Sequence, residues 1–386
     1  METVNRMPDD QSLPSEAICS RLRTALTETR GLGRRALIKS LGGLLGGAAL
    51  AHFPGAITLA DAATLPVTAF VFGGAWKKAA MKAFGEPFTQ KTGIPMAYQD
   101  PYTFPKLRAM HEAHAMQVDV VSIQGEEIHQ AERMNMIMPL DFSVIDRSAL
   151  DPKQLRHGNA IGGHALSYCI CYSKKKWPGD EHPASWADFW DVEKFPGRRA
   201  LRTDPLWTIE AALKADGVKD SEFYPLDLDR AFQTLERIKP HIKTWWSDNS
   251  LSQQLMEQEE VDVIAMMNGR ATESILDHHA PFALVWNEAI CEGGNQAWMV
   301  PVGCPNPHGG MEFLDIVGRA EYEAVFARLI YYGPQNPKAF DLIEPSLAKL
   351  MPTYPANQNL AHMVDFSWWS QNLPAVQRRF QLWLQS

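Results

Sequence analysis

The sequence has 386 residues, of which 45% are hydrophobic and 10% aromatic, a composition that excludes an intrinsically disordered chain. Its net charge of −8 argues against nucleic acid or an anionic membrane surface as a partner. A chain of this length is expected to fold as two lobes, because a single hydrophobic core rarely grows so large.

An arginine pair near the start of the chain indicates an export signal. Residues 33–39 read Gly-Arg-Arg-Ala-Leu-Ile-Lys, and a run rich in glycine, alanine and leucine follows up to Ala62. This pattern is typical of a twin-arginine signal peptide, so we expect the twin-arginine export machinery to recognise residues 1–62 and the trimmed protein to work in the periplasm. The alternative is a membrane anchor, for which residues 41–60 contain too many glycines, a proline and a histidine.

The first half of the expected mature protein alternates between strands and helices. Apolar, β-branched and aromatic runs predict buried strands, and longer periodic segments predict helices. The expected strands are residues 67–72 and 118–123, and the expected helices are residues 77–90 and 126–134. Gly73-Gly74 ends the first strand, and Gly93 is the expected stop of the first helix. This order predicts an α/β lobe with a mainly parallel sheet.

The second half has the same alternation. The expected strands are residues 166–172 and 261–267, and the expected helices are residues 208–215, 228–239 and 251–260. Leu228, Phe232, Leu235 and Ile238 recur at helical spacing and predict one buried face. No repeat of fixed period and no low-complexity linker is present, so we expect two lobes joined by short strand crossings.

Four of the five cysteines follow the expected signal peptide. Cys169 and Cys171 alternate along one expected strand, which places both thiols on one side and predicts buried hydrophobic packing, with a redox or metal role as the alternative. Cys291 and Cys304 are spaced to allow a disulfide in an oxidising compartment, and the sequence leaves both the bonded and the reduced state open.

Six short motifs, in one order, resemble those of the periplasmic substrate-binding proteins of ABC importers, in the spermidine/putrescine-binding branch. The motifs are Gly73-Gly74-Ala75-Trp76, Trp186-Ala187-Asp188-Phe189-Trp190-Asp191, Lys194-Phe195-Pro196-Gly197, Tyr224-Pro225-Leu226-Asp227, Asn268-Gly269-Arg270-Ala271 and Val300-Pro301-Val302-Gly303-Cys304-Pro305-Asn306. The likeness spans residues 64–386. Each motif is weak alone, and their common order carries the resemblance.

The resemblance implies a two-lobed type II binding-protein fold, in which each α/β lobe has a mainly parallel sheet and a hinge closes the lobes over a ligand. It places lobe 1 at residues 63–165 plus 286–330 and lobe 2 at residues 166–285 plus 331–386. It also implies a monomer without a cofactor, delivery of a small organic amine or amino-acid-like ligand to an ABC permease in the inner membrane, and no enzymatic activity. The chain contains no phosphate-binding Gly-x-x-x-x-Gly-Lys-Ser/Thr loop, so it is not the transporter's ATPase.

A cleft for organic amines needs aromatic faces for cations and methylenes, and carboxylates for ammonium groups. The expected ligand-binding residues are Gly74, Trp76, Asp204, Trp207, Trp246, Arg270, Trp286 and Gln296. Trp76 and Trp207 lie at strand-to-helix turns, where open α/β sheets present ligand sites, whereas Trp246 and Trp286 are as consistent with core packing. Gly74 allows the backbone to approach a ligand closely.

Polyamine binders that resemble this chain carry three acids in the cleft. Here Asp204 matches the first, Trp207 replaces the second, and Gln296 stands at the third, with Glu292 nearby. Arg270 is suited to bind a carboxylate through two hydrogen bonds, and a structural ion pair is its alternative role. The sequence therefore favours a ligand with one cationic end and one anionic end, such as an amino acid or an ω-amino acid.

Three alternatives remain. A polyamine binder proper fits the resemblance, and Tyr331-Tyr332 is a tyrosine pair of the kind that binds ferric iron on this fold. An exported enzyme is the third. Its motifs are missing from the sequence: His111-Glu112-Ala113-His114 lacks metalloprotease spacing, and no Gly-x-Ser-x-Gly elbow occurs.

Overall fold

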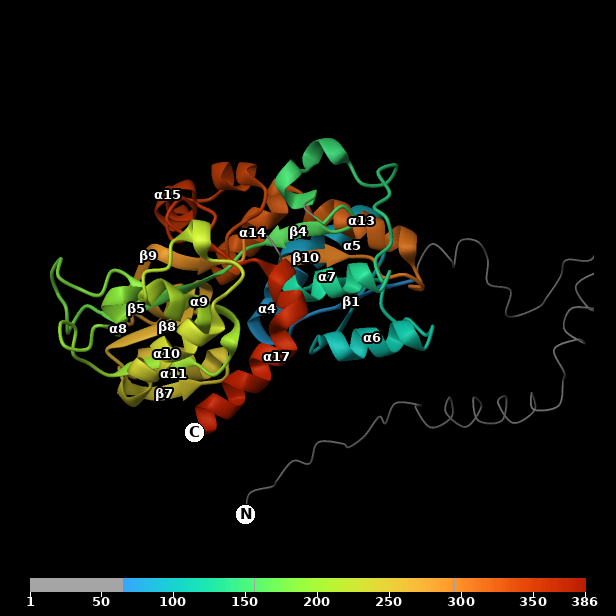
Figure 1. Ribbon diagram of the computed structural model, residues 1–386. Helices are drawn as coiled ribbons and strands as arrows, with labels where there is room; N and C mark the ends of the chain where they lie inside the picture. Colours follow the sequence, from blue (N-terminus) through green and yellow to red (C-terminus); the bar gives the residue numbers. More distant parts are fainter. Residues whose placement is uncertain (1–64, 156, 294–295) are drawn as a thin grey trace, which may run out of the picture. The chain divides into compact units, whose positions relative to one another are not determined.

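The computed structural model describes residues 65–155, 157–293 and 296–386, which belong to a single compact unit. The predictions made for residues 1–62, the signal peptide and its cleavage, lie outside the described residues. The part of the chain that the structure describes contains one five-stranded and one six-stranded β-sheet, each flanked by helices (Figure 1).

The first sheet has the strand order β2-β1-β3-β10-β4. Its strands are β1 (Val67–Phe70), β2 (Met96–Gln99), β3 (Val120–Ile123), β4 (Ile161–His164) and β10 (Gln296–Met299). Strand β1 pairs in parallel with β2 and β3, whereas β10 pairs antiparallel with β3 and β4. Side chains alternate across β1, so Val67 and Ala69 enter one hydrophobic core and Phe70 enters the other.

Helices cover both faces of the first sheet. They are α4 (Gly74–Ala80), α5 (Glu86–Thr92), α6 (Phe104–Glu112), α7 (Gly125–Arg133), α13 (Pro307–Val317) and α14 (Ala320–Ile330), and a π-helical turn at Met81–Gly85 joins α4 to α5. Gly93 ends α5 in the left-handed conformation and donates its N–H to the Thr89 carbonyl, which confirms the expected stop signal. Helix α4 begins earlier than residue 77, at Gly74, whose φ of +64° suits glycine.

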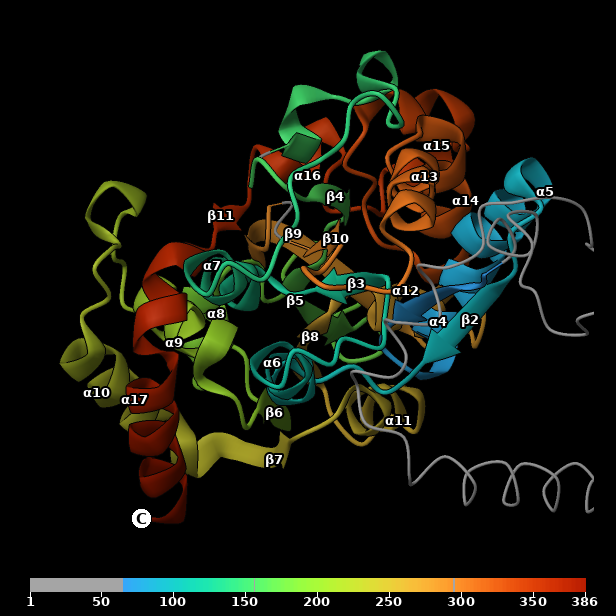
Figure 2. The ribbon, with the colours of Figure 1, turned by 90° about the vertical axis from the view of Figure 1, so that its right-hand side faces the viewer.

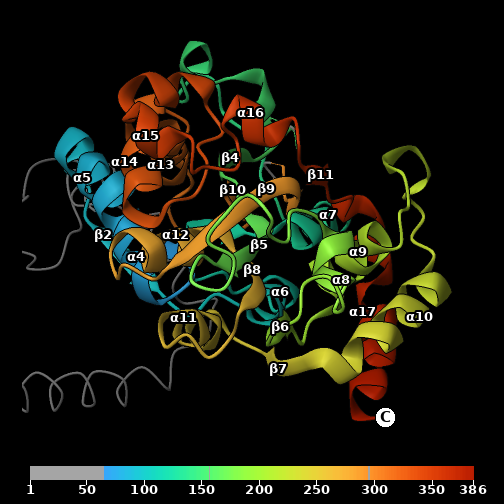
Figure 3. The ribbon, with the colours of Figure 1, turned by 90° about the vertical axis from the view of Figure 1, so that its left-hand side faces the viewer.

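The second sheet has the strand order β11-β9-β5-β8-β6-β7. Its strands are β5 (Ser167–Ser173), β6 (Arg199–Arg202), β7 (Ile242–Trp246), β8 (Val263–Met267), β9 (Phe282–Cys291) and β11 (His362–Met363). Figure 3 shows β9 and β5 side by side at the centre of this view. Strand β5 runs antiparallel to β8 and β9, and the other pairings are parallel.

The remaining helices pack mostly against the second sheet. They are α8 (Trp186–Trp190), α9 (Pro205–Ala215), α10 (Leu228–Ile238), α11 (Asn249–Glu257), α12 (Asn268–Leu276), α15 (Pro345–Ala348), α16 (Pro355–Gln358) and the long C-terminal α17 (Phe366–Gln385). Short 3₁₀ turns lie at Arg147–Ala149, Pro152–Leu155, Asp220–Glu222, Lys239–His241 and Pro337–Leu342. Helix α17 lies beside both α9 and α7, as Figures 1 and 2 show.

The α/β architecture expected from the sequence is confirmed, and both sheets are mixed, with antiparallel pairings beside the parallel ones. The expected buried face of α10 is confirmed for Phe232, Leu235 and Ile238, while Leu228 is half-buried. The polypeptide leaves the second sheet after Cys291 and enters the first at Gln296, later than the lobe boundary expected at residue 286. The boundaries of the lobes themselves stay a prediction.

The cysteines in the described residues are thiols. Cys169 and Cys171 are buried in β5, as expected. Cys291 ends β9 in the second sheet and Cys304 follows β10 of the first sheet, and the structure shows no disulfide between them. Among the described residues, no helix has both the length and the apolarity needed to cross a lipid bilayer.

Candidate functional site

A cavity of about 270 Å³ is lined by residues from both sheets. The first sheet and its helices contribute Phe72, Gly73, Trp76, Gln124, His164 and Gln296. The second sheet and its surroundings contribute Leu166, Arg202, Trp207, Asn249, Met267, Arg270, Glu292 and Tyr332. This volume suits a molecule smaller than a typical drug, because drug-sized ligands occupy about 300–1,000 Å³.

One wall of the cavity is aromatic and holds a neutral histidine. The indole N–H of Trp76 donates to Nε2 of His164 at 3.5 Å, and the His164 ring stacks on Tyr332 with centroids 5.3 Å apart. Burial lowers the pKa of His164 to about 3, so the ring is uncharged at neutral pH. Because Nε2 accepts a hydrogen bond, the proton resides on Nδ1, which makes Nδ1 a donor.

The start of α9 places an indole beside an arginine. Trp207 has φ +70° and ψ −34° and breaks the helical geometry at the first turn of α9, a conformation that costs a non-glycine residue about 1–3 kcal/mol. The Arg202 guanidinium lies over the Trp207 ring at 4.9 Å and over the Trp246 ring at 5.5 Å. Arg202, the last residue of β6, is therefore held by cation–π contacts at the cavity wall.

A second arginine enters the cavity from α12. Arg270 follows β8 in the first turn of that helix, and its Nη1 donates to the Glu273 carboxylate at 2.7 Å. This ion pair is the structural role considered for Arg270, and the side chain also lines the cavity. The two roles are compatible, because a guanidinium carries five donors and Glu273 uses one edge.

A buried carboxyl group provides the opposite charge. Glu292 is 1% exposed, and desolvation raises its pKa to about 8, while the hydrogen bond with the Gln296 side chain and the positive charge of Arg202 act in the opposite direction. Gln296 pairs with His164 across β10 and β4, so the amide and the imidazole sit on neighbouring strands. A cation that enters the cavity would stabilise the ionised form of Glu292.

Several buried polar atoms of the cavity residues have no hydrogen-bond partner within the described part of the chain. The donors are Nε of Arg202, Nε1 of Trp207 and Nδ1 of His164, and the acceptors are Oδ1 of Asn249 and Oε1 of Gln296. Buried polar groups in native proteins are almost always paired, with protein, water or ligand. The cavity thus offers both kinds of group to a small polar molecule.

The structure brings together four of the eight expected site residues. Trp76, Trp207, Arg270 and Gln296 line the cavity. Gly74 is adjacent to the lining residue Gly73.

The other three expected site residues lie outside the cavity lining. The Asp204 carboxylate caps α9 by accepting from the Leu206 N–H at 3.0 Å, and it lies 3.9 Å from Arg202. Trp246 is fully buried and donates to the Ala265 carbonyl. Trp286 is a half-buried residue of β9.

Sequence reasoning missed several lining residues, above all Arg202, His164, Asn249 and Tyr332. Arg202 and His164 are the last residues of β6 and β4, and polar residues at strand ends are a signal that was available. Tyr332 was read only as half of a tyrosine pair. Its partner Tyr331 donates to Asp277 at 2.9 Å, and burial raises the pKa of both phenols to about 12.

Comparison with known proteins identifies the family. Residues 83–359 match the family described as bacterial extracellular solute-binding protein. The chain belongs to this family. It is 29% identical to the gamma-aminobutyric acid-binding protein of Pseudomonas aeruginosa over 84% of this chain and 92% of that protein, and 24% identical to the spermidine/putrescine-binding periplasmic protein of Escherichia coli over 70% of this chain and 78% of that protein.

Solved structures agree with the assignment. An ABC transporter substrate-binding protein from Bradyrhizobium japonicum is 34% identical, with a TM-score of 0.76 over 83% of this chain and 100% of that one. The structure of the Atu4243 GABA receptor is 32% identical, with a TM-score of 0.75 over 83% and 97% of the two chains. The solute-binding fold expected from the six motifs is therefore confirmed, and the cavity lies where its residues from both sheets meet.

Proposed function

We propose that this solute-binding protein is the exported receptor of an ABC importer and binds an ω-amino acid of the size of γ-aminobutyrate (GABA) in the cavity between its two sheets. The supporting observation is that basic and acidic side chains line one small cavity. Arg202 and Arg270 are the basic residues, and Glu292 is the acidic residue. The names of two relatives, a GABA-binding protein and a GABA receptor, point to the same ligand class.

The donors and acceptors suggest how such a ligand is held. The guanidinium groups of Arg202 and Arg270, with the indole N–H of Trp207, suit a carboxylate. Glu292, with Oε1 of Gln296, suits an ammonium group, and Trp76 offers an aromatic face to the methylenes between them. Closure of the lobes around this ligand and release to a membrane permease complete the proposed cycle.

A polyamine is the second candidate, since the Escherichia coli relative is named for spermidine and putrescine. A dication needs acids at both ends, and Glu292 is the only acidic residue among those that line the cavity in the described part of the chain. Two arginines in the same lining oppose a second cationic group. The ferric-iron and enzyme alternatives receive no support from the family or from these relatives.

The proposal includes export. The arginine pair at residues 34–35 and the run that follows support a twin-arginine signal, and the relative from Escherichia coli is periplasmic by name. We infer that the working protein is a periplasmic monomer without enzymatic activity.

Calorimetric titration of the purified protein tests the ligand class. GABA is expected to bind more tightly than putrescine, and Arg270→Ala is expected to weaken GABA binding by about 10- to 100-fold, because it removes a charge-assisted hydrogen bond. The matched control is Arg230→Ala, which removes an arginine that pairs with Asp216 on the surface of the second lobe and should leave the affinity unchanged.

The reverse ranking decides against the proposal. If putrescine binds far more tightly than GABA and Arg270→Ala does not change the affinity for GABA, the cavity belongs to a polyamine receptor.

A further inference from the structure

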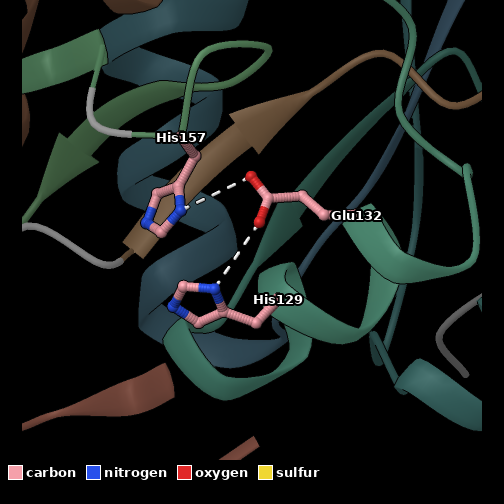
Figure 4. A group of neighbouring side chains, drawn as sticks. All are labelled: His129, Glu132 and His157. Atoms are coloured by element: carbon pink, nitrogen blue, oxygen red, sulfur yellow. Dashed lines mark ion pairs between the residues drawn. The ribbon is translucent and has the colours of Figure 1, made fainter.

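Two histidines and a glutamate meet at the C-terminal end of α7. His129 and Glu132 lie on α7, and His157 lies on the segment between the 3₁₀ turn at Pro152–Leu155 and β4. Figure 4 shows the Glu132 carboxylate between the two imidazole rings. None of these residues lines the cavity proposed for the ligand.

The three side chains present their ligand atoms to one another. Nδ1 of His129 lies 3.5 Å from Oε2 of Glu132, and Nδ1 of His157 lies 3.6 Å from Oε1. Both distances exceed the 2.7–3.2 Å of a good N–H···O hydrogen bond. They are close to the ~3.3 Å that separates neighbouring ligands on a tetrahedron with metal–ligand bonds of ~2.0–2.1 Å.

We propose that His129, Glu132 and His157 form a binding site for Zn²⁺ or a similar transition-metal ion. Their ligand atoms all lie within 4.8 Å of one another, so one ion can contact all three after small side-chain movements. Two imidazoles and one carboxylate match the ligand preference of zinc, whereas calcium and magnesium prefer oxygen alone. His129 and Glu132 are partly exposed, which leaves the fourth position to water.

The site joins two elements that both reach the cavity. Helix α7 starts after Gln124, and β4 ends at His164, and both residues line the cavity at the far ends of their elements. A bound ion would fasten the C-terminal end of α7 to the segment that leads into β4. The proposed ion would thus link these two elements at a place away from the ligand cavity.

Zinc titration of the tag-free protein, first stripped with a chelator, tests the site. One equivalent of Zn²⁺ is expected to bind and to raise the melting temperature by several degrees. The double variant His129→Ala/His157→Ala is expected to bind zinc at least about 100-fold more weakly and to lose the zinc-dependent rise in melting temperature.

The control is His278→Ala. His278 contacts Glu257 at 2.6 Å but belongs to no three-residue ligand group among the described residues, so its loss should leave zinc binding unchanged. The proposal is overturned if the stripped protein binds no zinc, or if the double variant binds zinc as tightly as the unaltered protein while its melting temperature without metal shows that it is folded. Neither result bears on the ligand of the cavity.

Discussion

Glu292 is a buried carboxyl group that would have to lose its proton to pair with the cationic end of the proposed ligand. Its pKa of about 8 means that most molecules of the ligand-free protein carry a proton on this group at pH 7. An ammonium group beside it lowers that pKa, so binding at pH 7 expels the proton. Affinity for the ligand then depends on pH even though the ligand itself does not titrate near neutrality.

The affinity for GABA is expected to rise between pH 6 and pH 8, by up to about tenfold per pH unit, because fewer protons must leave at higher pH. Glu292→Gln is expected to bind GABA more weakly and without this slope. Glu210→Gln provides the control, because burial raises the pKa of Glu210 to about 7 but this residue lies outside the cavity lining and bonds to Trp369 and Tyr224. Calorimetry across the pH range measures the affinity of the unaltered protein and of both variants for GABA. An affinity of the unaltered protein that does not change with pH would contradict the role of Glu292.

The residues that the sequence could identify are those placed by local signals. Trp76 follows a strand and a glycine pair, and Trp207 follows a capping aspartate and a proline, so both stood out as loop aromatics. The positive φ of Trp207, which the tertiary structure imposes against local preference, was not readable. The end of β6 was a signal for Arg202, but only the assembled sheets show that Arg202 and Glu292, the residue directly after β9, line one cavity.

At the scale of elements, the C-terminal helix α17 contacts helices that belong to both sheets. It packs against α9 beside the second sheet and against α7 beside the first (Figure 2). Arg133 at the end of α7 donates from Nη1 to Oγ of Ser370 at 3.1 Å and from Nη2 to the Ser370 carbonyl at 3.2 Å. These two hydrogen bonds therefore link α7, beside the first sheet, to α17, which also packs on α9 beside the second sheet.

Arg133→Ala is expected to weaken ligand binding by about threefold to tenfold, mainly through faster dissociation, because the lost hydrogen bonds favour separation of the lobes. Arg379→Ala is the matched control, since Arg379 lies on α17, the helix that Arg133 contacts, but pairs with Asp229 of α10. Stopped-flow measurement separates a change in the dissociation rate from a change in the association rate. Equal dissociation rates for Arg133→Ala and the unaltered protein would show that this contact does not restrain opening.

Most elements were predictable because hydrophobic spacing is a local property. The expected helix at residues 228–239 is α10 at Leu228–Ile238, and the expected strand at residues 261–267 is β8 at Val263–Met267. Strand direction was less accessible, since an apolar run such as β5 has the same pattern in a parallel and an antiparallel pairing. The apolar pattern of β9 likewise does not indicate which sheet the strand joins. The sequence therefore did not show that β9 pairs within the second sheet up to Cys291.

For the molecule as a whole, buried acids govern the dependence of stability on pH. Desolvation is the main cause that raises the pKa values of Glu126 and Glu292 to about 8, whereas an unfolded glutamate has a pKa near 4.3. Between these values the folded protein binds more protons than the unfolded chain, so the free energy of unfolding falls as pH rises. His164, with a pKa of about 3 in the folded protein, acts in the opposite direction only below the unfolded value of about 6.5.

The ligand-free protein is therefore expected to lose stability between pH 6.5 and pH 8, by about 1–2 kcal/mol for each of the two carboxyl groups. Urea unfolding at the two pH values measures the difference. The double variant Glu126→Gln/Glu292→Gln should lose less stability over this range, by the share of these two groups, while other buried acids such as Glu210 keep theirs. A protein that is equally or more stable at pH 8 would contradict this account.

The position of Glu292 has a consequence for solute uptake from an acidic medium. Glu292 directly follows β9, on the stretch that carries the chain from one sheet to the other, so under the proposed function a proton and the ligand cation would compete for this carboxyl group. As the medium outside the cell acidifies, protonation of Glu292 is favoured, and a larger fraction of the receptors would carry no ligand. The importer that this receptor is proposed to serve would then take up its ligand best at neutral to mildly alkaline pH, and uptake would decline as the medium becomes acidic.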